Sequence, residues 1–191
     1  MIQRVQNLYL ILVFIALVIL TIGTDVFVST VTEPNSFTAI THANVYGVQR
    51  DISIEGDVSE ASAEYIKTIT EKVEVPSENL QGIPTFYFPF FSITILMCII
   101  TAATVLSFKK LKRQLRLGRI LFVVNFIGFG TVLVLYYLLR QETAGLSDSF
   151  VTSHQLGIGF YCIVTATAFS FLANIGIRRD IKLIESIDRI R

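Results

Sequence analysis

The residues best suited to chemistry in this chain of 191 residues are two cysteines and two histidines. Cys98 and Cys162 each lie deep inside a long apolar stretch, and neither belongs to a C-x-x-C pair. Thiol–disulfide chemistry needs paired cysteines that reagents can reach. The sequence therefore gives little support to a redox enzyme that uses Cys98 and Cys162, and this hypothesis ranks below the two described at the end of this section.

The two histidines do not indicate a metal site. His42 and His154 have no second ligand-type residue three or four positions away. A structural zinc ion needs about four ligands, and haem needs axial ligands inside a bundle. Nucleotide-binding loops, nucleophile motifs and zinc motifs are also missing from the sequence. We therefore expect no catalytic residue, no metal, no cofactor and no enzyme activity.

The elements that would position these residues are long and apolar. The chain is 52% hydrophobic and 16% charged, with a mean hydropathy of +0.63. Four stretches, at about residues 8–28, 85–108, 120–139 and 155–177, have the roughly 20 apolar residues that a membrane span needs. The sequence predicts an all-α transmembrane four-helix bundle, with a small β-rich extracytoplasmic cap between helices one and two. The whole chain, 1–191, is expected to be one domain.

The distribution of charge predicts the orientation in the membrane. Twelve of the 16 Lys and Arg residues fall in the amino-terminal tail, the junction between spans two and three, and the tail 178–191. One face then carries a net charge of +9 and the other −8. The positive-inside rule makes the basic face cytoplasmic, so both termini are expected there. A net charge of only +1 argues against a nucleic-acid partner.

The outer segment 29–84 is polar and acidic. Residues 37–41, 45–54 and 65–75 are rich in Thr, Val, Ile and Tyr, which favours strands. A helix over 59–72 is the alternative for the last of these. In the tail 178–191, isoleucines recur every three residues, which indicates a continuation of span four or a helix on the membrane surface. Docking of a partner protein on the isoleucine stripe is the alternative.

Small and polar residues inside the spans are candidates for helix packing or a partner interface, because small residues at a spacing of four allow close helix approach in lipid. These candidates are Thr94, Cys98, Ala102, Asn125, Gly128, Cys162, Ala166, Ser170 and Asn174. The basic junction gives candidates for lipid headgroups, namely Lys109, Lys110, Lys112, Arg113 and Arg116.

Three segments resemble a known family. They are the start Met1–Gln6, the junction Lys109–Leu117, and the end, where Leu172–Asn174 and Ile177–Asp180 precede Ser186–Arg191. Together they resemble a domain-of-unknown-function family of small four-span membrane proteins from Bacteroidota. The resemblance implies a bacterial inner-membrane protein and leaves its activity open.

Two functional hypotheses remain besides the redox enzyme. The first is a non-catalytic accessory or scaffold subunit that packs against a larger complex, with membrane lipids and other integral membrane proteins, or a second copy, as partners. The alternative is a small transporter, channel or lipid-binding protein that uses Asn125, Asn174 and the basic junction. A fold analogy to claudin-like four-span proteins carries little weight, because Trp and outer-loop Cys are missing.

Overall fold

The computed structural model describes residues 3–34, 37–55, 63–67, 80–87, 90–144 and 150–188. The chain divides into two compact units. We call 1–23, 91–133 and 161–191 the helical unit, and 24–90 and 134–160 the sheet unit. Each is described by itself below.

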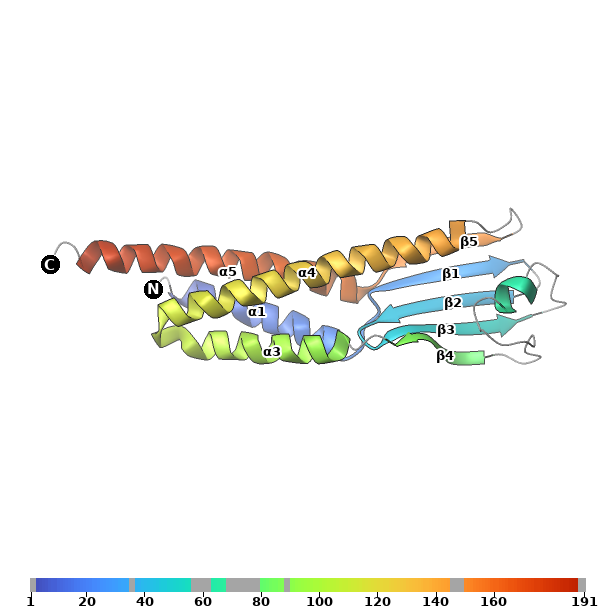
Figure 1. Cartoon of the computed structure of the whole chain (residues 1–191), viewed down its shortest axis with the longest axis horizontal. Helices are drawn as coiled ribbons and strands as arrows, with labels where there is room; N and C mark the ends of the chain where they lie inside the picture. Colours follow the sequence, from blue (N-terminus) through green and yellow to red (C-terminus); the bar gives the residue numbers. More distant parts are fainter. Residues whose placement is uncertain are drawn as a thin grey trace. The chain divides into compact units, whose positions relative to one another are not determined.

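The helical unit is built from α1 (Gln3–Thr21), α3 (Phe90–Leu106), the short 3-10 helix η1 (Ser107–Lys109), and the larger parts of α4 (Leu111–Ala144) and α5 (Ile158–Asp188). Figure 1 shows these helices running along one another. α1 ends where Gly23 takes a φ of 96°, a left-handed conformation that glycine adopts without steric cost. α5 continues without a break to Asp188, so the predicted tail is an extension of the helix.

The sheet unit contains β1 (Phe27–Glu33), β2 (Phe37–Asn44), β3 (Gly47–Ile54), β4 (Leu80–Tyr87) and β5 (Val151–Leu156). Their order in the sheet is β4-β3-β2-β1-β5, and every pair is antiparallel. A tight turn joins β2 to β3, in which the Asn44 side chain accepts a hydrogen bond from the Tyr46 backbone N–H.

One face of the sheet is buried. Along β2, buried residues alternate with half-buried ones, as the two-residue period of a strand requires. Side chains of β1, β2 and β3 form a core with Tyr65 and Ile66 from the helical segment 63–67, and Phe150 packs against it. After β5 the chain passes so close to Asp25 that a Cβ at Gly157 would lie 2.1 Å from the Asp25 carbonyl oxygen.

The predicted all-α four-helix bundle is wrong. The chain contains a five-stranded antiparallel sheet, and within its described residues only 111–141 and 158–186 are long and apolar enough to cross a membrane. The apolar helices at 5–21 and 90–106 are shorter. Three of the predicted spans include residues that belong to a strand. Span 8–28 overlaps β1, span 85–108 overlaps β4, and span 155–177 overlaps β5. Apolar strand residues beside an apolar helix extend the hydrophobic run, and hydropathy alone cannot separate the two.

Two of the three strands predicted for the outer segment 29–84 are present in the structure. Strands at 37–41 and 45–54 are confirmed as β2 and β3, with bounds shifted by a few residues. Residues 65–67, predicted as the start of a strand, are helical, as the alternative had it. Residues 68–75, and the rest of the alternative helix over 59–72, lie outside the described residues.

Candidate functional site

The interior of the helical unit is unusually polar. Nine polar or charged side chains in it are less than 10% exposed: Gln6, Thr94, Thr101, Thr104, Gln114, Asn125, Ser170, Asn174 and Asp180. Most of the hydroxyls donate to a carbonyl three or four residues earlier in their own helix, as Thr101 does to Met97 at 2.7 Å. The Asn125 amide likewise donates to the Leu121 carbonyl. These groups are satisfied locally, so they do not need water.

Among the described residues, side-chain hydrogen bonds connect α1, α4 and α5 at three points. The Asn174 amide on α5 donates to the Gly118 carbonyl on α4 at 2.8 Å. The Gln114 amide on α4 donates to the Asn7 side chain on α1 at 3.4 Å. The Gln6 amide on α1 donates to the Asp180 carboxyl on α5. Together they connect α1, α4 and α5 through side chains that lie within the interior of the unit.

Two glycines make these approaches possible. A Cβ at Gly118 would lie 2.7 Å from Asn174 Oδ1, and a Cβ at Gly176 would lie 2.8 Å from Gln6 Cγ. Both distances are below van der Waals contact, so the helices can be this close only because these positions lack a side chain.

Among the described residues of this interior, the buried oxygens Asn174 Oδ1 and Asp180 Oδ1 have no hydrogen-bond partner. An unsatisfied buried polar atom costs about 1–3 kcal/mol. Asp180 is 5% exposed although it is an acid near the end of the helix. It is the buried polar group that most needs explanation.

The outside of the helical unit is apolar. Large hydrophobic side chains on all four helices are about half exposed, among them Leu8, Leu96, Phe126 and Phe171. The described surface of the unit is thus apolar, while its interior contains polar side chains beside apolar ones such as Leu10 and Leu121.

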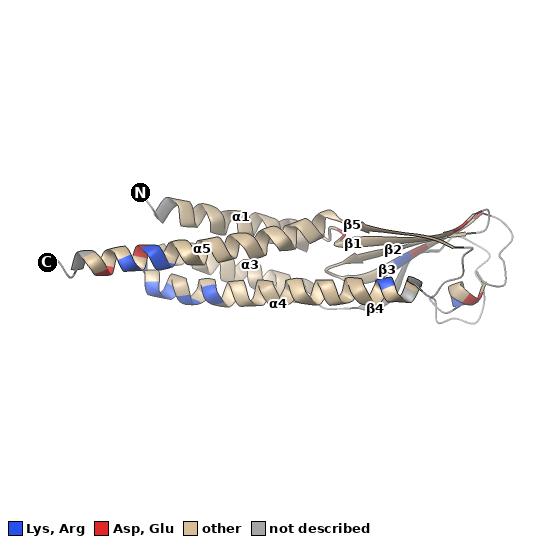
Figure 2. Cartoon of the chain, turned by 90° about the horizontal axis from the view of Figure 1, so that it is seen from above, with Lys and Arg blue, Asp and Glu red and all other residues tan. Residues whose placement is uncertain are grey.

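The charged residues of the helical unit gather at one end. Figure 2 shows Lys and Arg at the start of α4 and in the last turns of α5, at the end where both termini lie. Lys110, Lys112, Arg113 and Arg116 are exposed there, as are Arg178 and Arg179. Lys109 ends the 3-10 helix η1. We call this group the basic end.

The predicted packing residues lie as follows. Cys162, Ala166, Ser170 and Asn174 are all buried along one stripe of α5. On α3, Thr94 is buried, and Cys98 and Ala102 are half-buried. Both cysteines are free thiols. Gly128 differs from the others, since a Cβ added there would meet no atom within 4 Å. Whether any of these residues contacts a second protein stays a prediction.

Comparison with known families gives one result. The family described as Domain of unknown function (DUF4293) matches residues 2–190. The chain belongs to the DUF4293 family. The resemblance seen in the sequence is therefore confirmed as far as a domain of unknown function, and the family description adds no source and no membrane spans. No curated protein and no solved structure matches the chain.

This DUF4293 chain also has an acid–histidine cluster in its sheet unit, which the sequence analysis missed. His42 Nδ1 lies 3.0 Å from Asp25 Oδ2, and His42 Nε2 lies 3.8 Å from Asp51 Oδ2. Asp25 precedes β1, His42 is on β2 and Asp51 is on β3, so only the strand register brings them together. Among the described residues, no group of three or more His, Cys, Asp or Glu side chains could hold a metal ion.

The second histidine has a different environment. His154 on β5 lies 3.3 Å from the Thr143 hydroxyl and packs edge-on against the Tyr136 ring. Burial lowers the pKa of His154, and the nearby Arg140 charge lowers it further. The neutral imidazole is therefore favoured in the folded DUF4293 chain.

Proposed function

We propose that the chain is a non-catalytic, multi-pass protein of a bacterial inner membrane that acts as an accessory or scaffold subunit of a larger membrane complex. Its partners are membrane lipids and another integral membrane protein. The proposal has three parts: the helical unit is embedded in the membrane, both termini are cytoplasmic, and the sheet unit binds a partner protein. Different observations support each part.

The apolar exterior of the helical unit and the polar side chains buried between its helices support embedding in a membrane. If the unit were in water, apolar side chains such as Ile99 and Ile127, each about 60% exposed, would be in unfavourable contact with solvent. At about 25 cal/mol per Å² of apolar surface, a lipid environment removes that cost. The interhelical bonds of Gln6 and Asn174 fit the same environment, because polar side chains hydrogen-bond helices together in lipid.

The basic end supports an orientation with both termini in the cytoplasm. The contacts Gln6–Asp180 and Asn7–Gln114 hold the start of α1 beside the start of α4 and the last turns of α5. The basic residues of α4 and α5 are at this same end. By the positive-inside rule the end is cytoplasmic, and the chain between α4 and α5, which includes β5, is then extracytoplasmic.

The observation that carries the partner-binding role is the open edge of the sheet at β5. Within the part of the chain that the structure describes, this strand pairs with β1 on one side and with no strand on the other, and five of its six residues are exposed. Val151 and Leu156 are 62% and 43% exposed. Such an edge has free backbone N–H and C=O groups and pairs readily with an extended segment of another chain. We therefore propose that an extracytoplasmic segment of the partner adds to β5 as a sixth strand.

Site-specific photocrosslinking in native membranes tests this function. A photoreactive residue at Thr152 on β5 should crosslink to one membrane protein in high yield. The same residue at Gln49, which is exposed on the interior strand β3, serves as the matched control and should give little product. The complex should survive purification of the full chain in mild detergent. A lone monomer without a Thr152 crosslink would contradict the proposal.

A further inference from the structure

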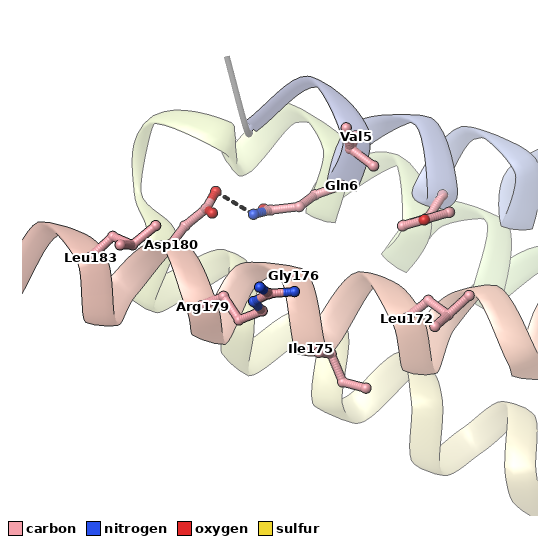
Figure 3. Close-up of a pocket in the computed structure, with 9 residues that line it drawn as sticks. Val5, Gln6, Leu172, Ile175, Gly176, Arg179, Asp180 and Leu183 are labelled. Carbon is pink, nitrogen blue, oxygen red and sulfur yellow. Dashed lines mark hydrogen bonds between the residues drawn. The ribbon is translucent and has the colours of Figure 1, made fainter.

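A pocket of about 390 Å³ lies between α1 and α5 in the helical unit. Figure 3 shows Asp180 and Gln6 reaching toward each other from α5 and α1, with Arg179 beside them. Gln6 is 2% exposed and Asp180 is 5% exposed, whereas Arg179 is exposed. The Gln6 amide occupies one carboxyl oxygen of Asp180, and the other oxygen, Oδ1, has no partner among the described side chains. The pocket thus contains a buried acceptor that lacks a donor.

The remaining wall of the pocket is apolar. Val5 on α1 and Leu172 and Leu183 on α5 line it, and each is 40–49% exposed. The pocket therefore combines a hydrogen-bond acceptor, a cation and an aliphatic surface. A ligand that matches all three has an N–H cation, an anion close to it and a hydrocarbon tail.

We propose that this pocket binds a zwitterionic phospholipid with a primary ammonium group, of the phosphatidylethanolamine class. The ammonium group donates to Asp180 Oδ1, the phosphate pairs with the Arg179 guanidinium, and an acyl chain runs from there along Leu172, about two turns nearer the middle of α5. A charge-assisted hydrogen bond of this kind satisfies the buried oxygen. A choline headgroup has no N–H to donate, and a glycerol headgroup has no cation, so neither provides the same match.

The position of the pocket agrees with a lipid ligand. It lies at the basic end, where Arg178, Arg179 and Lys182 share two turns of α5 with Asp180. Basic residues at the end of a membrane helix mark the headgroup level. This inference rests on the proposed embedding of the helical unit, and it is independent of any protein partner.

Native mass spectrometry of the full chain in detergent tests the selectivity. Phosphatidylethanolamine, phosphatidylcholine and phosphatidylglycerol with identical acyl chains are titrated separately. We expect the ethanolamine lipid to bind at least about fivefold more tightly than the other two. Glycerophosphoethanolamine, the same headgroup without chains, should not displace it at millimolar concentration. Equal binding of the three lipids, or displacement by the soluble headgroup, would overturn the proposal.

Two variants with matched controls assign the binding to this pocket. Asp180→Asn should reduce the preference for ethanolamine over choline to less than about twofold, and Asp51→Asn in the sheet unit should leave it unchanged. Arg179→Gln should weaken all three phospholipids severalfold, whereas Arg178→Gln, one residue earlier and outside the pocket lining, should not. If Asp180→Asn fails to fold, the wild-type selectivity still decides the question.

A flotation assay separates the two proposals. A chain that does not enter lipid vesicles would contradict the embedding on which the proposed function depends. A chain that enters vesicles but binds the three lipids equally would contradict the pocket alone.

Discussion

At the scale of single residues, the helical unit depends on positions where one helix has no side chain and its neighbour has a polar one. Gly118 faces Asn174, and Gly176 faces Gln6. In each pair the polar side chain also makes an interhelical hydrogen bond. Packing and polar satisfaction are therefore coupled, and a change to the glycine disturbs both.

Gly118→Ala tests this coupling. The new Cβ would lie 2.7 Å from Asn174 Oδ1, so Asn174 must move and its 2.8 Å bond to the Gly118 carbonyl is lost. We expect a loss of roughly 1–3 kcal/mol in the free energy of unfolding. Gly128→Ala on the same helix is the control, because its Cβ meets no atom within 4 Å. It should be neutral or stabilising by up to about 1 kcal/mol. Unfolding of the detergent-solubilised chain measures both, and equal effects would contradict the coupling.

His154 gives a prediction about pH. Burial, with a smaller contribution from Arg140, lowers its pKa below the ordinary value of 6.5. The unfolded chain then binds a proton more readily than the folded one. Stability from this residue is complete above about pH 6.5 and is lost as the pH falls toward the folded pKa.

An NMR titration of the His154 ring in the full chain measures this pKa directly. The midpoint should lie below 6.5, and Arg140→Gln should raise it part of the way back. His42→Gln removes the only other histidine signal and so assigns the resonance. A midpoint at or above 6.5 would show that the imidazole is not held in a desolvating environment.

The sequence predicts which side chains share a helix face, but it does not predict contacts between residues that are far apart in the chain. The α5 stripe of Cys162, Ala166, Ser170 and Asn174 has a spacing of four, which places it on one helix face in any helix. The Gln6–Asp180 contact has no such signal, because its partners come from the two ends of the chain. The same holds for His42 with Asp25 and Asp51, which only the strand register brings together.

At the scale of elements, β5 shows why the sequence predicts four helices and not a sheet that is completed by a strand between α4 and α5. It is a short strand between two long apolar helices, and its partner β1 directly follows α1. β2 and β3 were predictable because they are neighbours in the chain, with strand-favouring residues and a turn between them. The pairing of β1 with β5 is long-range, and neither composition nor periodicity predicts it.

A pair of proline variants tests the edge position of β5. The Gly157 N–H donates to the Val26 carbonyl. Since successive N–H groups alternate along a strand, the N–H of Ser153 points to β1 and that of Thr152 points away. Ser153→Pro should therefore remove a ladder hydrogen bond to β1 and destabilise the protein by roughly 1–3 kcal/mol, the cost of leaving its acceptor without a donor. Thr152→Pro should leave the fold intact, because proline is tolerated on an open edge.

The two variants also separate folding from partner binding. Thr152→Pro removes an outward N–H, so it should weaken the proposed partner complex while circular dichroism and the unfolding midpoint stay close to wild type. If Thr152→Pro destabilised the chain as much as Ser153→Pro, the outer side of β5 would be in use within the protein. The sheet would then have no free edge at β5.

At the scale of the whole molecule, the proposed orientation in the membrane rests on the distribution of charge. The net charge of +1 hides a concentration of Lys and Arg at the basic end. Each such residue near an anionic leaflet contributes about 1 kcal/mol of attraction. Four exposed basic residues within seven positions, Lys110 to Arg116, are therefore enough to bias insertion strongly.

Neutralising this segment should randomise the orientation. In a variant with Lys110, Lys112, Arg113 and Arg116 all changed to Gln, we expect a substantial fraction of chains to insert with the sheet unit facing the cytoplasm. A cysteine at Gln49, in a chain with Cys98 and Cys162 changed to Ala, reports the orientation through a membrane-impermeant thiol reagent on intact cells. With the basic segment present nearly all chains should be labelled, and without it the labelled fraction should fall markedly.

Arg50→Gln would be a poor control for this experiment because that side chain is buried in the sheet unit. Lys67→Gln is better, since Lys67 is exposed and belongs to the opposite charge group. Its loss makes the outer face more acidic, so labelling should stay complete. If neutralising the four basic residues left labelling unchanged, the remaining basic residues of that face, among them Arg178, Arg179 and Lys182, would have to set the orientation. Labelling that stays complete after Arg178→Gln, Arg179→Gln and Lys182→Gln are added would contradict the orientation by charge.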